Sequence, residues 1–181
     1  MRIHLLLFAL LAIEPLSAAK TLNACVGAKL PAQVESLVNS KFPGWRAKML
    51  SDLDQDDRQL WSKAHPDACP GLAVGKFQRP DQIAYAILLV PTSEPTGGYK
   101  VIVVAKADGS DDYSVQTLDH ANGAADSGLV ISKAPPGKYS DFDDMSSIKS
   151  KLDAVNVEWI EKGAVLYYYS RGKYHKLQTS D

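Results

Sequence analysis

The last part of the 181-residue chain consists of strand-like runs separated by very short turns. Residues 155–160 alternate apolar with polar side chains, as a strand with one buried face does. Lys162-Gly163 then turns the chain into residues 165–170, and Arg171-Gly172 turns it again. Residues 173–177 follow directly. Strands joined this tightly must be antiparallel, because a parallel return needs a crossover of a dozen or more residues. The sequence therefore predicts a C-terminal antiparallel meander.

A helix is predicted before the strands, in residues 31–42. Its apolar residues recur at helical spacing, at Val34, Leu37, Val38 and Phe42. Pro31 suits a first helical turn, and Pro43-Gly44 stops the helix. Residues 45–50 follow as a short strand that leads into an acidic stretch. This helix is expected to lay one apolar stripe on the core of the protein.

Five more strand-like runs are separated by segments rich in Gly, Pro and Asp. They cover residues 72–77, 83–90, 99–106, 113–118 and 128–133. Residues 120–127 are small and polar and predict a loop. Residues 134–139 are predicted to be irregular, because their two prolines cannot donate hydrogen bonds to a neighbouring strand. The predicted fold class is α+β, with one or two N-terminal helices packed on an antiparallel sheet of about seven or eight short strands.

The first nineteen residues have the organisation of a secretory signal peptide. Arg2 supplies a positive charge, residues 5–13 are continuously apolar, and Ser17-Ala18-Ala19 offers the small residues that a signal peptidase reads. The apolar run is too short for a membrane span, which needs about 20 residues. We expect residues 1–19 to be removed and residues 20–181 to form one domain without a membrane span, in the periplasm or outside the cell.

Cys25 and Cys69 are the two cysteines of the chain. In an oxidising compartment such a pair is expected to form one disulfide. The competing interpretation is a reactive or metal-binding thiol pair. The lack of C-x-x-C spacing and the predicted export disfavour that interpretation, so we predict a disulfide.

An acidic stretch precedes an aromatic residue and raises the question of a calcium loop. Its alternating carboxylates are Asp52, Asp54 and Asp56. Counted from the first of them, the sixth position of an EF-hand loop should be Gly and is Asp57. The twelfth should be Glu and is Lys63. The alternative is the acidic N-terminus of a short helix, where negative charge complements the dipole. We favour the helix, with Leu60 and Trp61 facing the core.

Residues 70–90, PGLAVGKFQRPDQIAYAILLV, form a strand-like run, a turn and a second apolar run. This segment resembles the FG-GAP (VCBS-like) unit of secreted bacterial proteins, in which a strand enters an aspartate-rich calcium turn before an apolar strand. Lys76, Gln78 and Arg79 stand where that unit has successive Asp or Asn, and only Asp81 is left. The resemblance therefore implies a β-hairpin and weighs against bound calcium.

Three histidines follow the predicted signal peptide: His65, His120 and His175. They show neither H-x-x-x-H nor H-E-x-x-H spacing, so we predict no zinc site. His65 precedes a proline and is interpreted as a loop residue, and His175 falls on a polar terminal strand. His120 begins a Gly/Ala-rich loop. It is the one of the three that we expect to line a pocket.

Catalytic signatures are equally scarce in the sequence. There is no G-x-S-x-G elbow, and both cysteines are expected to be oxidised. Asp141, Asp143 and Asp144 are candidates for acid–base chemistry, but charge clusters of this kind are usually solvated loop faces. We therefore predict no catalytic residue, no metal and no cofactor, and whether the chain has an activity is left open.

Aromatic residues supply the remaining signal. Of Tyr167, Tyr168 and Tyr169, which share one strand, Tyr168 must face away from the other two. Tyr139 and Phe142 stand among acidic residues in a loop stiffened by two prolines. Aromatic side chains on a rigid loop suit protein recognition. The competing interpretation is that both residues pin the loop onto the core.

These observations predict an exported, non-enzymatic binding protein with a protein partner, such as an inhibitor or immunity factor against a secreted enzyme. Its candidate binding residues are Tyr139, Asp141, Phe142, Asp143, Asp144, Tyr168 and His120. The net charge of −1 disfavours nucleic acid as a partner, since that calls for a basic patch. The alternative is an envelope enzyme or small-ligand-binding protein with a scattered site near His120 and the acidic loops.

Overall fold

The computed structural model describes Cys25, residues 29–123 and residues 127–181. The predicted signal peptide, residues 1–19, lies outside these ranges. Within them, no helix combines the length and the hydrophobicity that crossing a membrane requires.

Two α-helices, one 3-10 helix and eleven strands make up the described residues. The helices are α3 (Ala32–Lys41), η1 (Leu50–Asp52) and α4 (Gln55–Ala64). The strands of the first half are β1 (Trp45–Ala47), β2 (Leu72–Gly75), β3 (Ala84–Pro91), β4 (Gly98–Lys106) and β5 (Tyr113–Asn122). Those of the second half are β6 (Leu129–Ala134), β7 (Gly137–Ser140), β8 (Ser147–Ser150), β9 (Ala154–Trp159), β10 (Gly163–Ser170) and β11 (Lys173–Ser180).

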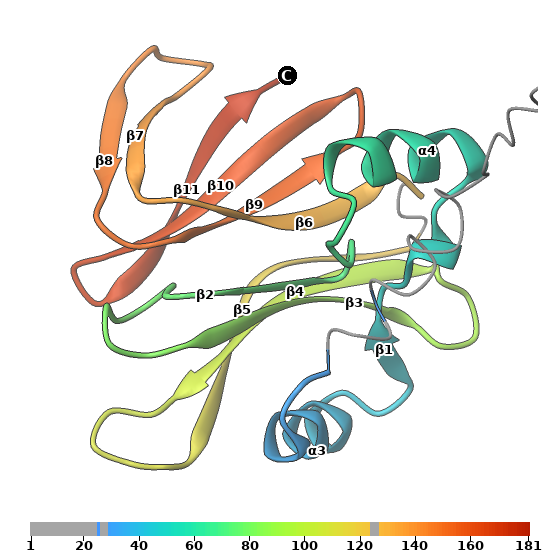
Figure 1. The fold of residues 1–181 in the computed structure, drawn as a ribbon, viewed down its shortest axis with the longest axis horizontal. Helices are drawn as coiled ribbons and strands as arrows, with labels where there is room; N and C mark the ends of the chain where they lie inside the picture. Colours follow the sequence, from blue (N-terminus) through green and yellow to red (C-terminus); the bar gives the residue numbers. More distant parts are fainter. Residues whose placement is uncertain (1–24, 26–28, 124–126) are drawn as a thin grey trace, which may run out of the picture.

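The strands form two antiparallel sheets that pack face to face and a separate hairpin of β7 and β8 (Figure 1). The five-stranded sheet has the order β1-β3-β4-β5, and β2 pairs with β3. The four-stranded sheet has the order β11-β10-β9-β6. The α+β class, the antiparallel pairing and the C-terminal meander are confirmed. The predicted single sheet of seven or eight strands is wrong.

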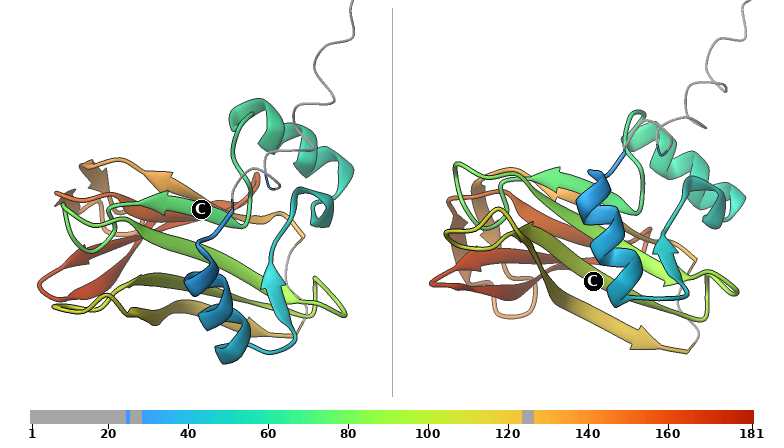
Figure 2. Two further views of the ribbon diagram at one scale, coloured as in Figure 1. Left: turned by 60° about the horizontal axis from the view of Figure 1, so that its bottom comes forward. Right: turned by 90° about the horizontal axis from the view of Figure 1, so that it is seen from below.

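The reason for two sheets lies in the apolar runs of β3 and β4, which are buried on both faces. One face, with residues such as Leu88 and Val103, packs against Ile131 and Val157 of the four-stranded sheet. The opposite face is covered by α3. Figure 2 shows this helix lying across the outer side of the five-stranded sheet. Strands that are apolar on both faces need cover on both sides, and a single sheet with helices on one side could not supply it.

The end of β5 departs from the predicted loop at residues 120–127. The strand continues to Asn122, past a register shift opposite Val101 and Ile102. Asp119 follows this shift and accepts a hydrogen bond of 2.7 Å from the Tyr167 hydroxyl of the other sheet. Burial, and then the bond to Asp119, raise the pKa of Tyr167 well above its ordinary value. The register shift thus lets Asp119 of the edge strand β5 form a hydrogen bond to the other sheet, and this bond helps to hold the two sheets together.

Residues 134–139 are also more regular than predicted. Pro135 and Pro136 lie outside the ladder, as expected, but β7 begins directly after them and pairs with β8. A proline is excluded only from positions that must donate a hydrogen bond, so two adjacent prolines end one strand without preventing the next.

The acidic stretch begins α4, as predicted. Asp54 is the N-cap residue, and its side chain accepts the N–H of Asp57 at 2.9 Å. Asp52 instead accepts two hydrogen bonds from Arg46, at 2.6 and 2.7 Å. Trp61 is buried against the outer face of the four-stranded sheet, as predicted. Leu60 does not face the core, because it is 40% exposed.

The predicted disulfide between Cys25 and Cys69 is present. Its two Cα atoms lie 4.6 Å apart, and the cysteines are separated by 44 residues in the sequence. The bond ties the segment before α3 to the segment that follows α4. The corner of the molecule that carries α4 is therefore closed covalently.

Candidate functional site

The β7–β8 hairpin lies against the outer face of the four-stranded sheet, away from α4 (Figure 1). Tyr139 and Ile148 are cross-strand partners in the hairpin. Both pack on a small buried cluster formed by Ala154, Leu166 and Leu177. The Tyr139 hydroxyl also donates a hydrogen bond to the carbonyl of Pro135. Tyr139 therefore pins the hairpin onto the sheet, as one of the two interpretations expected.

Phe142 behaves differently, although it lies only three residues later. Its N–H donates to the carbonyl of Gln178 at 2.8 Å, so its backbone is held against β11. Its side chain is nevertheless 52% exposed. Met145, in the same turn, is 79% exposed and has a φ of 59°. The tip of the hairpin thus presents two large apolar side chains to solvent.

The acidic residues of the tip hold its shape. Asp141 Oδ1 accepts the N–H groups of Asp143 and Asp144, at 2.9 and 3.3 Å. The Ser146 side chain and N–H donate to Asp144, and these bonds lower the pKa of that carboxyl. The N–H of Asp141 closes the turn on the carbonyl of Ser146 at 2.8 Å. We call residues 141–146 the acidic tip: a rigid turn with two exposed apolar side chains among carboxylates.

Tyr168 lies on the outer face of β10, as the alternation predicted, while Tyr167 is buried between the sheets. Its ring stacks on that of His175 with centroids 5.3 Å apart and planes inclined by 18°. Tyr168 and Tyr139 pack against the same cluster. The structure therefore brings these two predicted residues together, but Tyr168 is half-buried.

His120 does not join the other predicted site residues. It is exposed on β5, in the five-stranded sheet, whereas the acidic tip lies on the far side of the four-stranded sheet (Figure 1). His120 lines none of the pockets described here. The structure therefore does not bring His120 and the acidic loop around Asp141 together, because the two belong to different layers of the fold.

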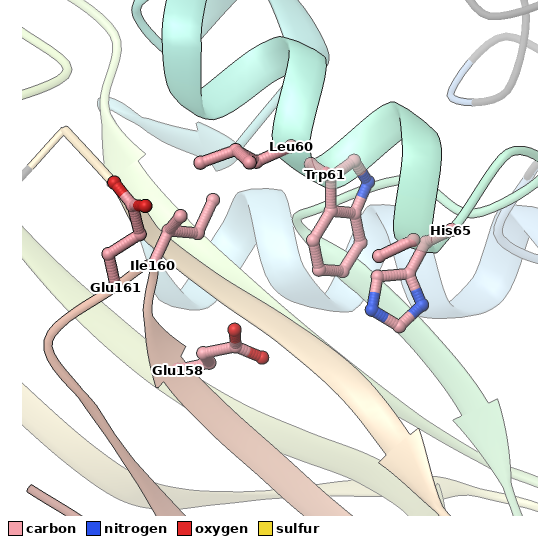
Figure 3. A pocket seen from close by; sticks show the side chains of 7 residues that line it. Leu60, Trp61, His65, Glu158, Ile160 and Glu161 are labelled. Carbon is pink, nitrogen blue, oxygen red and sulfur yellow. The ribbon is translucent and has the colours of Figure 1, made fainter.

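A pocket of about 230 Å³ opens between α4 and the end of β9 (Figure 3). Leu60, Trp61 and Ile160 supply its apolar walls, and Glu158 and Glu161 supply carboxylates from the sheet side. The ring of His65 lies 4.2 Å from that of Trp61, centroid to centroid. Trp61 itself is fixed by its Nε1–H, which donates to the carbonyl of Ala68 at 3.0 Å.

Sequence reasoning missed this pocket. His65 was interpreted as a loop residue, and it is the C-cap residue directly after α4. Its ring nevertheless lies next to that of Trp61, four residues earlier. Glu161 lies in the turn after β9 with a φ of 61°. No local pattern indicates that this turn meets α4, because the contact depends on how the helix crosses the sheet.

Among residues 29–123, 127–181 and Cys25, no group of three His, Cys, Asp or Glu side chains is placed to hold a metal ion. Comparison with family models, with curated proteins and with solved structures finds no significant match. The resemblance of residues 70–90 to the FG-GAP unit stays a prediction. The β-hairpin that it implies is present, since β2 and β3 pair antiparallel.

Proposed function

We propose that the protein is an exported, non-enzymatic binding protein that recognises a protein partner through its acidic tip. The observation that carries this proposal is the exposure of Phe142 and Met145 on a turn fixed by hydrogen bonds. The predicted signal peptide and the Cys25–Cys69 disulfide support export, because disulfides persist in oxidising compartments.

Rigidity is what makes the acidic tip suitable for binding. A loop that is already ordered loses little conformational entropy when it docks. The carboxylate of Asp141 and the backbone of Phe142 order the tip before any partner arrives. A flexible loop with the same side chains would lose part of its binding energy in becoming ordered.

The side chains of the acidic tip indicate what kind of partner surface would fit it. Phe142 and Met145 call for an apolar recess, and Asp143 and Asp144 call for a basic rim around it. Aromatic anchors that enter a pocket contribute most of the energy of many interfaces, while charged rims mainly set association rates. An inhibitor or immunity factor against a secreted enzyme, with a tip that enters a basic cleft, is the finer form of this proposal.

The test is capture of the partner from an envelope extract of the source organism by immobilised protein. The informative variant is Phe142→Ala with Met145→Ala. The matched control is Val74→Ala with Ile83→Ala, because these side chains are 43% and 46% exposed in another part of the molecule. Both double variants remove exposed apolar area and should unfold at the same denaturant concentration as the native chain.

We expect one stoichiometric partner on the native protein and on the control variant, and its loss on the tip variant. Retention by the tip variant, or equal loss on both variants, would contradict a role for the tip. Asp143→Asn with Asp144→Asn should slow association and flatten its dependence on salt, because rim charges act mainly on the on-rate.

A second candidate function, binding of a small cationic ligand, is favoured by the pocket beneath α4. Apolar walls next to Glu158 and Glu161 suit the alkyl chain and the ammonium group of an aliphatic amine. Titration with hexylammonium should change the fluorescence of Trp61 in the native chain, and Trp61→Phe should abolish that change. An unchanged spectrum up to millimolar amine would eliminate this candidate.

A further inference from the structure

A second pocket, of about 590 Å³, lies at the base of the β7–β8 hairpin, at the end opposite to the acidic tip. Lys149, Lys151 and Leu152 line it from the hairpin side, and the turn between β10 and β11 lines it from the other. The end of β10 contributes Tyr168, Tyr169 and Ser170, the turn contributes Arg171, and Pro80 completes the lining. Three cations and no carboxylate thus line this pocket, in a chain whose net charge is −1.

Both lysines line the pocket, one from a strand and one from the bend after it. Lys149 belongs to β8, and Lys151 follows the last residue of that strand. Ser150, between them, is buried and donates its hydroxyl to the carbonyl of Leu152 at 2.7 Å. This bond fixes the backbone where β8 ends, between the two lysines of the lining.

The protein itself does not neutralise these charges. Within the described part of the chain, no ion pair or side-chain hydrogen bond involves Lys149, Lys151 or Arg171. The cross-strand partner of Lys149 is Lys138, another cation. Like charges directly opposite each other destabilise a strand pair. Asp153, the carboxylate next in the sequence, is not part of the lining and accepts the backbone N–H of Lys76 at 2.8 Å.

Arg171 occupies an unusual backbone position. It precedes Gly172 in the two-residue turn between β10 and β11, with φ values of 52° and 81°. Such turns favour Asn, Asp or Gly at the first position, because these residues tolerate positive φ. An arginine there is strained, and its side chain is the one cation that this turn adds to the pocket.

The tyrosine side of the pocket is also held in place. Tyr168 stacks on His175, and the His175 ring Nε2 lies 3.2 Å from the carbonyl of Ser170. Tyr169 meets Tyr174 edge to face with centroids 5.1 Å apart. These contacts order the aromatic wall next to Arg171 before any ligand binds.

We propose that this pocket binds a small ligand that carries an oxyanion group on a ring. Lys149, Lys151 and Arg171 hold the oxyanion, because ammonium and guanidinium groups are the usual partners of phosphate, sulfate and carboxylate. The ring lies against Tyr168, Leu152 and Pro80. The volume is in the range of small-molecule sites and is larger than a bare anion needs.

Calorimetric titration at low ionic strength tests both halves of the proposal with defined probes. Phenyl phosphate should bind with a Kd below about 1 mM, more tightly than inorganic phosphate, which lacks the ring, and than phenol, which lacks the charge. Phenyl sulfate and benzoate then distinguish which oxyanion the cations prefer. If phenol bound with the same affinity as phenyl phosphate, recognition of the anion would be overturned. If inorganic phosphate bound with the same affinity as phenyl phosphate, the role of the ring would be overturned.

Three variants locate the site. Lys149→Gln with Lys151→Gln should weaken the binding of phenyl phosphate by about tenfold or more, since each lost hydrogen bond to a charged group has roughly that effect on affinity. Lys63→Gln, on exposed α4 at the other end of the molecule, removes a positive charge and should leave affinity unchanged. Arg171→Gly should weaken binding while raising the unfolding midpoint, because Gly removes the strain. A purely structural Arg171 would not produce these opposite changes.

Equal weakening by Lys63→Gln and by the double lysine variant would overturn the proposal, since it would show only non-specific attraction of anions. So would the absence of heat with every probe. The double variant should unfold at the same urea concentration as the native chain, which excludes misfolding as the cause of lost binding.

Discussion

Two regions cover the outer face of the four-stranded sheet, and they are held in opposite ways. The corner around α4 is closed by the Cys25–Cys69 disulfide and the Arg46–Asp52 ion pair, and Trp61 is buried beneath it. Its one large exposed apolar side chain on the helix is Leu60. The disulfide, the ion pair and the buried tryptophan thus all serve to hold the corner in place.

The β7–β8 hairpin has no such fastening. It is anchored mainly by Tyr139, and its tip is ordered by its own carboxylates and by the N–H of Phe142. The apolar side chains at the tip contribute little to the core. The difference predicts that substitutions in the corner lower stability, whereas substitutions at the acidic tip lower binding and leave stability unchanged.

The largest effect is expected at the centre of the corner. Trp61→Ala should lower the free energy of unfolding by about 3–5 kcal/mol, because it leaves a cavity under α4. Leu60→Ala, at the neighbouring exposed position, should cost far less. Urea denaturation measures both. Similar values for the two variants would mean that α4 does not pack on the sheet through Trp61.

Removal of the disulfide should have the next largest effect. Cys25→Ser with Cys69→Ser frees a segment of 44 residues, which corresponds to about 4 kcal/mol on the chain-entropy model. The loss should appear in urea denaturation and should equal the effect of a reductant on the native chain. A reductant that changes nothing would show that the corner is held by packing alone.

The ion pair of the corner should give a smaller and pH-dependent effect. Burial by itself raises the pKa of Asp52, but the hydrogen bonds from Arg46 and Met49 outweigh it and hold that pKa below 3.8. The pair therefore stabilises the fold above pH 3.8, and this contribution is lost as the pH falls through 3.8 towards the folded-state value.

Asp52→Asn should accordingly cost about 1–3 kcal/mol at pH 7 and progressively less in acid. Thermal unfolding from pH 7 to pH 3 measures the difference. Asp67→Asn, at an exposed position after α4, is the matched control for the loss of one negative charge and should cost little stability at pH 7. A constant difference between Asp52→Asn and the native chain over this range would contradict the assignment.

The smallest change in stability is expected at the tip. Phe142→Ala should alter the free energy of unfolding by no more than about 0.5 kcal/mol, as is usual for exposed positions. Tyr139→Ala should cost clearly more, because Tyr139 is the anchor of the hairpin. If Phe142→Ala destabilised the protein as much as Tyr139→Ala, both aromatic residues would belong to the core.

Local patterns predicted much of this fold. Helix α3, the cap at Asp54, the disulfide and the C-terminal meander each follow from residues close together in the sequence or from simple counting. The second sheet did not follow, although the apolar runs of β3 and β4 already required cover on both faces. What supplies that cover is decided by contacts between distant segments.

The residues of the candidate site were also predicted only in part from the sequence. Tyr139 and Phe142 have the same local character, and only the end of β7 at Ser140 separates a partly buried side chain from an exposed one. His120 was placed near the acidic loop, but the two lie on different sheets. Met145 was not noticed at all, because its exposure depends on the turn conformation.

The most direct test of the central claim is site-specific photo-crosslinking in the envelope of the source organism. A benzophenone amino acid would replace Phe142 at the acidic tip and, in a second protein, Leu60 on α4. The side chains at these two positions are 52% and 40% exposed. A discrete crosslinked partner from position 142 and none from position 60 is the predicted result. A crosslink from position 60 alone would show that the corner, and not the tip, contacts the partner.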